Sequence, residues 1–128
     1  MNNRNIIFTH VVTNSFVVNE EKLNDRSVLS LCSMLAAVTN MTDDVIIALF
    51  GTLDFEQIIM RHFDLGITGD ASLNDIVTLY SYINVYEEDR VVVKMVAKKQ
   101  DGDKKIAIAN GNFLFAIKNG VAMQFSMS

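Results

Sequence analysis

Residues 27–40 read Ser-Val-Leu-Ser-Leu-Cys-Ser-Met-Leu-Ala-Ala-Val-Thr-Asn. The apolar side chains of this segment fall nearly all round a helix, and Ser27, Ser30 and Ser33 recur every third residue as one narrow polar stripe. A strand of this length, with this content of leucine, methionine and alanine, would be unusual. We therefore predict a helix over residues 27–40 that is buried on all sides at the centre of the fold.

The chain before this helix divides into an extended segment and a polar turn. Residues 6–18 are rich in β-branched and aromatic side chains, which predicts a strand with an interruption around residues 13–15. Residues 19–25 are polar, and they offer Asn24 and Asp25 as N-caps for the helix.

The segment after the helix carries mixed signals. Residues 42–50 combine a capping threonine, two acids and a glycine just past the end, which favours a short helix, although their β-branched run would suit a strand. We prefer the helix. Residues 56–64 then predict a strand that is ended by the glycines at positions 66 and 69.

The C-terminal half predicts an antiparallel meander. Apolar and polar side chains alternate along three segments, which are residues 76–86, 91–98 and 105–117. The shared apolar face of the first segment holds Val77, Leu79, Ile83 and Val85, and that of the last holds Ala107, Ala109, Phe113, Phe115 and Ile117. The first two are joined by an acidic turn and the last two by an Asp-Gly hairpin.

Two smaller features complete this half of the chain. Gly111, inside the last of the three segments, predicts a bulge or a close approach of another strand. The tight turn at residues 119–120 could lead into a short final strand over residues 121–125. The order of strand, buried helix, strand and meander predicts an α+β fold in which a sheet curls around the helix.

Composition bounds the class of protein. A chain of 128 residues and 14.3 kDa predicts one domain, residues 1–128, with a sizeable core. Half of the residues are hydrophobic and 20% are charged, which excludes intrinsic disorder. The formal net charge of −4 lacks the positive field that nucleic-acid binding requires, so we expect no nucleic-acid partner.

The same composition suggests where the protein works. A single cysteine, Cys32, cannot form an internal disulfide, and this favours a reducing, cytoplasmic location. We see no apolar run close to the roughly 18 residues of a membrane span, and polar residues occur too early for a signal peptide, so we expect no membrane partner. A mean hydropathy of +0.24 is high for a soluble monomer and indicates surface that is hidden in an oligomer.

The order of segments resembles the hotdog fold and, within it, the acyl-CoA thioesterases. His-Val-Val at residues 10–12, followed by a polar loop, is similar to the start of that subfamily. Residues 23–37 are similar to its central helix with the preceding turn, and residues 73–79 to the entry of the strand that follows. The meander through residues 112–116 then lies where the family has it.

The resemblance implies a curved antiparallel sheet wrapped around a central helix, with two subunits paired through an edge strand. It implies an acyl-CoA or related thioester bound between subunits beside the helix N-terminus, and at least a homodimer. Helix N–H groups would polarise the thioester carbonyl, and a nearby carboxylate would act as nucleophile or general base. No cofactor is implied.

This sequence departs from the family at the residues that carry the reaction. The family has an acid about two turns into the helix, where an ungapped match places Ser33. The paired glycines that open the helix fall on Asp25 and Arg26, and the loop asparagine falls near Asn19.

The candidate catalytic residues are therefore Asp25, Glu21, Asn19 and Ser33. The candidate substrate-binding residues are Ser27, Ser30, Lys98 and Lys99, the lysines as partners of coenzyme A phosphates. Each has a structural alternative: Asp25 could be an N-cap, Glu21 a solvated charge, Ser33 a packing residue and the lysines solubilising groups. The two histidines and one cysteine lack metal-site spacing, so we expect no metal.

Three function hypotheses follow. The first is an acyl-CoA thioester hydrolase. The second is a catalytically inactive hotdog module that binds an acyl ligand or serves in assembly, because the helix lacks the usual carboxylate. A third is another small α+β dimer with an unrelated pocket.

Overall fold

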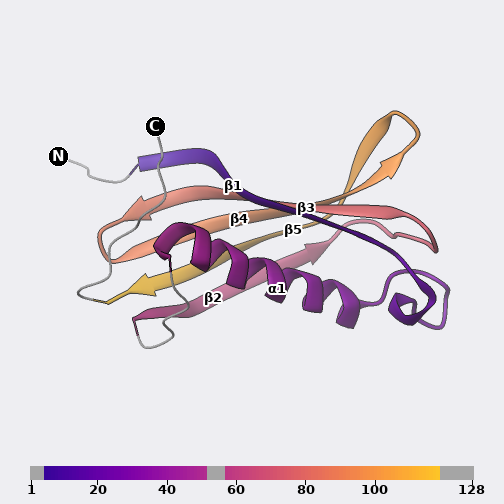
Figure 1. Ribbon diagram of the computed structural model, residues 1–128, viewed down its shortest axis with the longest axis horizontal. Helices are drawn as coiled ribbons and strands as arrows, with labels where there is room; N and C mark the ends of the chain where they lie inside the picture. Colours follow the sequence, from indigo (N-terminus) through magenta and orange to yellow (C-terminus); the bar gives the residue numbers. More distant parts are fainter. Residues whose placement is uncertain (1–4, 52–56, 119–128) are drawn as a thin grey trace.

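The protein, in a computed structural model that describes residues 5–51 and 57–118, consists of one sheet with a long helix across one face (Figure 1). Within the described residues, the elements in chain order are β1 (Asn5–Val17), the 3₁₀ helix η1 (Glu20–Lys22), α1 (Leu31–Phe50), β2 (Ile58–Ile67), β3 (Ile76–Glu87), β4 (Arg90–Asp101) and β5 (Lys104–Ile117). The strand order is β1-β3-β4-β5-β2, and all neighbours are antiparallel. The predicted α+β fold is confirmed.

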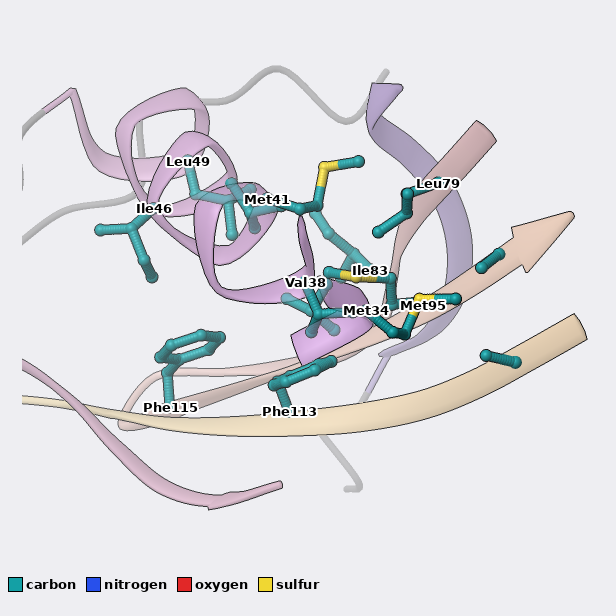
Figure 2. Close-up of a cluster of buried hydrophobic side chains, with 14 of the residues drawn as sticks. Met34, Val38, Met41, Ile46, Leu49, Leu79, Ile83, Met95, Phe113 and Phe115 are labelled. Carbon is teal, nitrogen blue, oxygen red and sulfur yellow. The ribbon is translucent and has the colours of Figure 1, made fainter. Parts of the chain in front are cut away.

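The core lies between α1 and the concave face of the sheet. Every second residue of β4 from Val91 to Ala97 is buried, as the predicted alternation requires. Figure 2 shows Met34 and Val38 of α1 beside Phe113 of β5, and Met41 extending toward Leu79 of β3. The same holds for β3, where Val77, Leu79 and Ile83 are buried; Val85, also predicted to face inward, follows a register shift and is half-buried. Alternation in the sequence therefore identified the inner face of the central strands.

The helix begins later and ends later than predicted. Ser30 is the N-cap, and its side-chain oxygen accepts from the Ser33 N–H at 3.1 Å. Ser27 has a left-handed φ of 62°, so the backbone cannot be helical there. Asn24 and Asp25 are therefore not N-caps of α1, and that prediction is wrong.

Residues 42–50 continue the same helix. The Thr42 hydroxyl donates to the Thr39 carbonyl inside the helix at 2.7 Å, so Thr42 is not a cap. The predicted glycine stop is confirmed, because Gly51 has a left-handed φ of 76° and its N–H donates to the Ile47 carbonyl.

The helix is buried on one side only, which corrects the prediction of burial all round. Val38 and Val45 face the sheet, whereas Leu31 is 59% exposed and Ile47 is 46% exposed. With 20 residues and only two charges, Asp43 and Asp44, α1 is also long and apolar enough to cross a membrane, contrary to the prediction that no apolar run is close to a membrane span. In this fold its apolar face packs on the sheet as the core helix.

Strand β1 runs through residues 13–15 without the predicted interruption. Its two register shifts against β3 lie before them, between Ile6 and Thr9 and between His10 and Thr13. The buried Ser81 hydroxyl donates to the Val12 carbonyl and accepts from the Val12 N–H, both at 2.9 Å, and so links β3 to β1 at the second of these shifts.

Strand β2 ends at Ile67, between the two glycines that were predicted to end it, so it passes Gly66 by one residue. The predicted close approach at Gly111 is confirmed, since a Cβ there would lie 2.2 Å from the Asp64 carbonyl oxygen. A register shift in β5 buries Ile108 and exposes Ala107, which was predicted to face inward. The predicted turn at 119–120 and strand at 121–125 lie outside the described residues.

Candidate functional site

A pocket of about 170 Å³ lies where the N-terminus of α1 meets the loop between β2 and β3. It is lined by the turn before the helix, the first turn of α1, the end of β2 with the loop that follows, and one residue of β5. These residues are Asn24, Arg26, Val28, Leu29, Ser30, Leu31, Met34, Ile67, Gly69, Asp70, Ala71 and Ile108. The pocket therefore joins segments that are far apart in the sequence.

Backbone hydrogen bonds hold the two loops of the pocket together. The Leu29 N–H donates to the Ala71 carbonyl at 2.7 Å, and Val28 forms an isolated antiparallel bridge with Ser72. The Asn24 side-chain oxygen accepts from the N–H groups of Arg26 and Val28 at 2.8 and 3.3 Å. This side chain and the left-handed Ser27 close the turn, so the pocket wall is fixed by the fold.

The N-terminus of α1 supplies hydrogen-bond donors to this region. The first N–H groups of a helix have no acceptor within it. The Ser30 side chain accepts from the N–H of Ser33, and the N–H groups of Leu31 and Cys32 are left without an acceptor in the helix. The helix dipole adds partial positive charge at the same end. A carbonyl oxygen placed here would therefore be polarised toward an oxyanion.

One carboxylate lines the pocket, and it belongs to Asp70. Lys99 donates from Nζ to the backbone carbonyl of Asp70 at 2.7 Å and so secures the loop that carries this acid. Arg26, in the turn before α1, is the cation in the lining. Sequence reasoning missed Asp70, which lies 39 positions after Leu31. The preceding Gly69 packs closely on β5, since a Cβ there would lie 3.2 Å from Ile108 Cγ2, but no local pattern in the sequence marks Asp70.

The structure brings only part of the predicted site together. Ser30 lines the pocket, and Lys99 reaches its wall through the Asp70 carbonyl. Asp25 and Ser27 are exposed in the turn before α1 and do not line the pocket. Lys98 lies on the outer face of the sheet, with Nζ 5.6 Å from the centre of the Tyr80 ring.

The remaining candidates lie farther along the surface. Glu21 is exposed on η1, and Asn19 is the exposed residue that precedes this helix. Ser33 lines a different pocket, and its Oγ accepts from the Ser30 hydroxyl at 3.0 Å. Neither histidine lines that pocket, so no imidazole is placed there to activate Ser33.

The observed helix start changes the comparison with the family's catalytic acid. Ser33 lies in the first turn, and a position two turns in falls on Ala37 or Val38. The first acid of α1 is Asp43, in the fourth turn. No carboxylate therefore stands on the half of the helix nearest the pocket.

Cys32 is a free thiol and is exposed at the start of α1, whereas the sequence favoured a buried position. Among residues 5–51 and 57–118, no group of three His, Cys, Asp or Glu side chains could hold a metal ion. The cytoplasmic location stays a prediction.

No protein-family model matches the chain, and no curated protein matches it in sequence. Among solved structures, a Staphylococcus aureus acyl-CoA hydrolase in complex with butyryl coenzyme A is similar at a TM-score of 0.73 and 11% identity, over 88% of this chain and 69% of that one. A hypothetical thioesterase from Streptococcus pneumoniae with coenzyme A is similar at a TM-score of 0.72 and 17% identity, over 97% of this chain and 89% of that one. A Streptococcus mutans protein bound to acetyl-CoA is similar at a TM-score of 0.70 and 13% identity, over 98% of this chain and 93% of that one.

Two of these neighbours are an acyl-CoA hydrolase and a hypothetical thioesterase, and the chain shares the architecture of all three across most of its length. The predicted hotdog fold, a curved antiparallel sheet around a central helix, is confirmed. At identities of 11–17% the likeness establishes the fold.

Proposed function

We propose that the protein binds an acyl-CoA or related thioester in the pocket at the N-terminus of α1 and hydrolyses it. One observation carries this proposal: the pocket combines the N-terminal end of a helix with a carboxylate, that of Asp70. The solved neighbours support the class of ligand, since their structures hold coenzyme A, acetyl-CoA or butyryl coenzyme A.

Hydrolysis of the thioester places negative charge on its carbonyl oxygen, and the pocket has groups suited to this step. The N–H groups of Leu31 and Cys32 would hold the thioester oxygen as it becomes an oxyanion. Asp70 would take a proton from the attacking water, which adds its oxygen to the carbonyl carbon. Collapse of this intermediate breaks the C–S bond, and the leaving sulfur takes the proton from Asp70, which yields a carboxylic acid and a free thiol.

The second candidate is an acyl-binding or assembly module without turnover. It is favoured by α1 itself, which carries no acid before Asp43. The two candidates differ in a single measurable step, the release of thiol from a bound thioester.

We expect Asp70→Asn to lower kcat by about 10²- to 10⁴-fold, because a general base is lost while the shape of the side chain is kept. The measurement is thiol release from short, medium, long and aryl acyl-CoA substrates in a chromogenic assay. Loss of activity in Asp25→Asn or Glu21→Gln, with Asp70→Asn fully active, would instead assign the base to an acid predicted from the sequence. Wild-type protein that binds these substrates without turnover would support the inactive module.

We further infer that two copies pair through β2, so that the pocket lies at a subunit interface. Strand β2 is an edge of the sheet, and its helix-facing residues are apolar. Among them Met60, Phe63 and Ile67 are 40–49% exposed. Beside them, a groove of about 170 Å³ runs between this strand and Leu35 and Thr39 of α1. A second copy would cover this surface.

Side-chain polarity favours one register for this pairing. In a two-fold antiparallel pair, residues opposite each other share a face, so an axis at Phe63 brings the two Phe63 rings together on the helix side. The same axis places His62 opposite Asp64 of the second copy. An axis at Asp64 would instead place the two Asp64 carboxylates opposite each other, where like charges repel. Ile67 lines the thioester pocket, so the start of the second copy's β2 would lie beside it.

We expect Phe63→Arg to convert a dimer into a monomer of 14.3 kDa, because it places a charge at the centre of the proposed interface. Size-exclusion chromatography with light scattering measures the mass. Ile106→Arg is the matched control, since Ile106 is 40% exposed but lies on β5 near the β4–β5 hairpin. A wild-type monomer at micromolar concentration, or a dimer that survives Phe63→Arg, would contradict this pairing.

A further inference from the structure

A second and larger pocket, of about 450 Å³, lies on the opposite flank of α1, between the helix and β1. Its residues come from β1, η1, α1 and β3, and none of them lines the thioester pocket. They are Asn14, Ser15, Phe16, Lys22, Ser33, Ala36, Ala37, Asn40 and Leu79. This volume is within the range of small-molecule sites.

The pocket is open because one face of the helix carries only short side chains. Residues 33, 36, 37 and 40 lie on a common face at spacings of three, four and seven, and they are a serine, two alanines and an asparagine. Phe16 and the almost fully buried Leu79 supply apolar surface opposite them. The distance along the helix from Ser33 to Asn40 is about 10 Å, so the pocket is a trough of about that length. Its lining is apolar at Phe16, Ala36, Ala37 and Leu79 and polar at the other five residues.

Charge and hydrogen-bond donors gather at one end of this trough. Lys22 is its only charged lining residue, is half-buried, and forms no ion pair with any residue in the described ranges. Its carbonyl accepts from the Ser30 N–H at 2.8 Å, which fixes this residue beside the helix N-terminus. Because the Ser30 hydroxyl donates to Ser33 Oγ, the hydroxyl proton of Ser33 is free to donate to a ligand.

The other end of the trough lies beside a carboxylate, and its Asn14 amide is already bonded. Asn14 Nδ2 donates to an Asp44 carboxylate oxygen at 2.8 Å and contacts the Met41 sulfur at 3.7 Å. This end therefore has no cation for an anionic group, and the polarity of the trough runs from Lys22 to Asn40.

We propose that this trough binds an aliphatic carboxylate of medium chain length. The carboxylate accepts from the Lys22 ammonium and the Ser33 hydroxyl, a charge-assisted arrangement that suits an anion with two oxygens. The alkyl chain lies along Ala36 and Ala37 against Phe16, where it buries apolar surface. This site is separate from the thioester pocket, and the proposal does not rest on hydrolysis.

Isothermal titration of the full chain with octanoate tests the proposal, with octanol and acetate as ligands that lack the charge or the chain. We expect saturable binding of octanoate that is about tenfold or more weaker in Lys22→Gln, which removes the cation. Ala36→Leu should weaken it similarly by filling the trough from an exposed helix position. Lys104→Gln, with the same change of charge at a distant exposed lysine, should bind as the wild type does.

Four results would overturn the proposal. The first three are the absence of saturable octanoate binding, equal binding of octanol and octanoate, and affinity unchanged in both Lys22→Gln and Ala36→Leu. Binding that is lost in Asp70→Asn but kept in Lys22→Gln would place octanoate in the thioester pocket and would overturn it as well. A protein that binds octanoate at the trough but releases no thiol would contradict hydrolysis alone.

Discussion

Replacing Leu49 with alanine is expected to lower the free energy of unfolding by about 3 kcal/mol. Leu49 is fully buried in the last turn of α1, where it belongs to the hydrophobic core beneath the helix. Truncation removes apolar contact and leaves a cavity that the sheet cannot close. For a chain of this size the loss corresponds to a fall in Tm of roughly 10 °C, which urea and thermal denaturation followed by circular dichroism would measure.

Ile47→Ala is the matched control for this prediction. Ile47 lies in the same turn of the same helix and has a side chain of the same size, but it is 46% exposed. We expect its replacement to change stability by less than about 0.5 kcal/mol. Equal losses in the two variants would contradict the one-sided burial of α1 and would indicate that a further surface covers Ile47.

Gly111→Ala is expected to destabilise the protein by about 2–3 kcal/mol. A Cβ at this position would lie 2.2 Å from the Asp64 carbonyl oxygen and 3.3 Å from the Leu65 Cα. Both are backbone atoms of β2, so no side-chain rotation relieves the clash, and β2 must move away from β5. Because β2 is also the proposed dimer strand, we expect the same variant to weaken self-association in light scattering.

Gly66→Ala controls for the loss of a glycine in this pair of strands. Gly66 pairs with Asn110, next to Gly111, yet a Cβ there would meet its nearest atoms at 3.8 and 3.9 Å, which is ordinary contact. We expect a change in stability within about 0.5 kcal/mol. A loss as large as that of Gly111→Ala would mean that β2 tolerates no added methyl group, whatever the local space.

The central strands could be predicted from the sequence because their pattern is local. Each inward residue from Val91 to Ala97 alternates with a more exposed one, so the period of two alone identified the buried face. The shift at Ile108 could not be seen in the same way. A bulge changes the phase of a strand without changing its composition, so Ala107 was assigned to the wrong face.

The ends of the helix depend on interactions across the chain. Residues 28 and 29 are apolar and suit a helix, but they pair with residues 71 and 72 and are held extended. Residues 45–47 are β-branched and suit a strand, but two of them are buried against the sheet as part of α1. Tertiary packing outweighed local preference at both ends.

The candidate site was only partly predictable for the same reason. Ser30 could be chosen because it lies beside the helix in sequence, and the pocket contains it. Asp70 could not, because its place in the pocket wall depends on the bridge between the loops at residues 28 and 72. The helix-proximal acids Asp25 and Glu21 were the natural choice from sequence and remain predictions.

The place of α1 in the chain order affects how the protein is made. Of the strands beneath the helix only β1 precedes it, whereas β3, β4 and β5, whose buried side chains form the core with it, are translated afterwards. During synthesis, a 20-residue apolar segment therefore leaves the ribosome before most of the strands that bury it exist. Newly made chains thus pass through an interval in which chaperones, or membrane-targeting factors that select such segments, compete with folding.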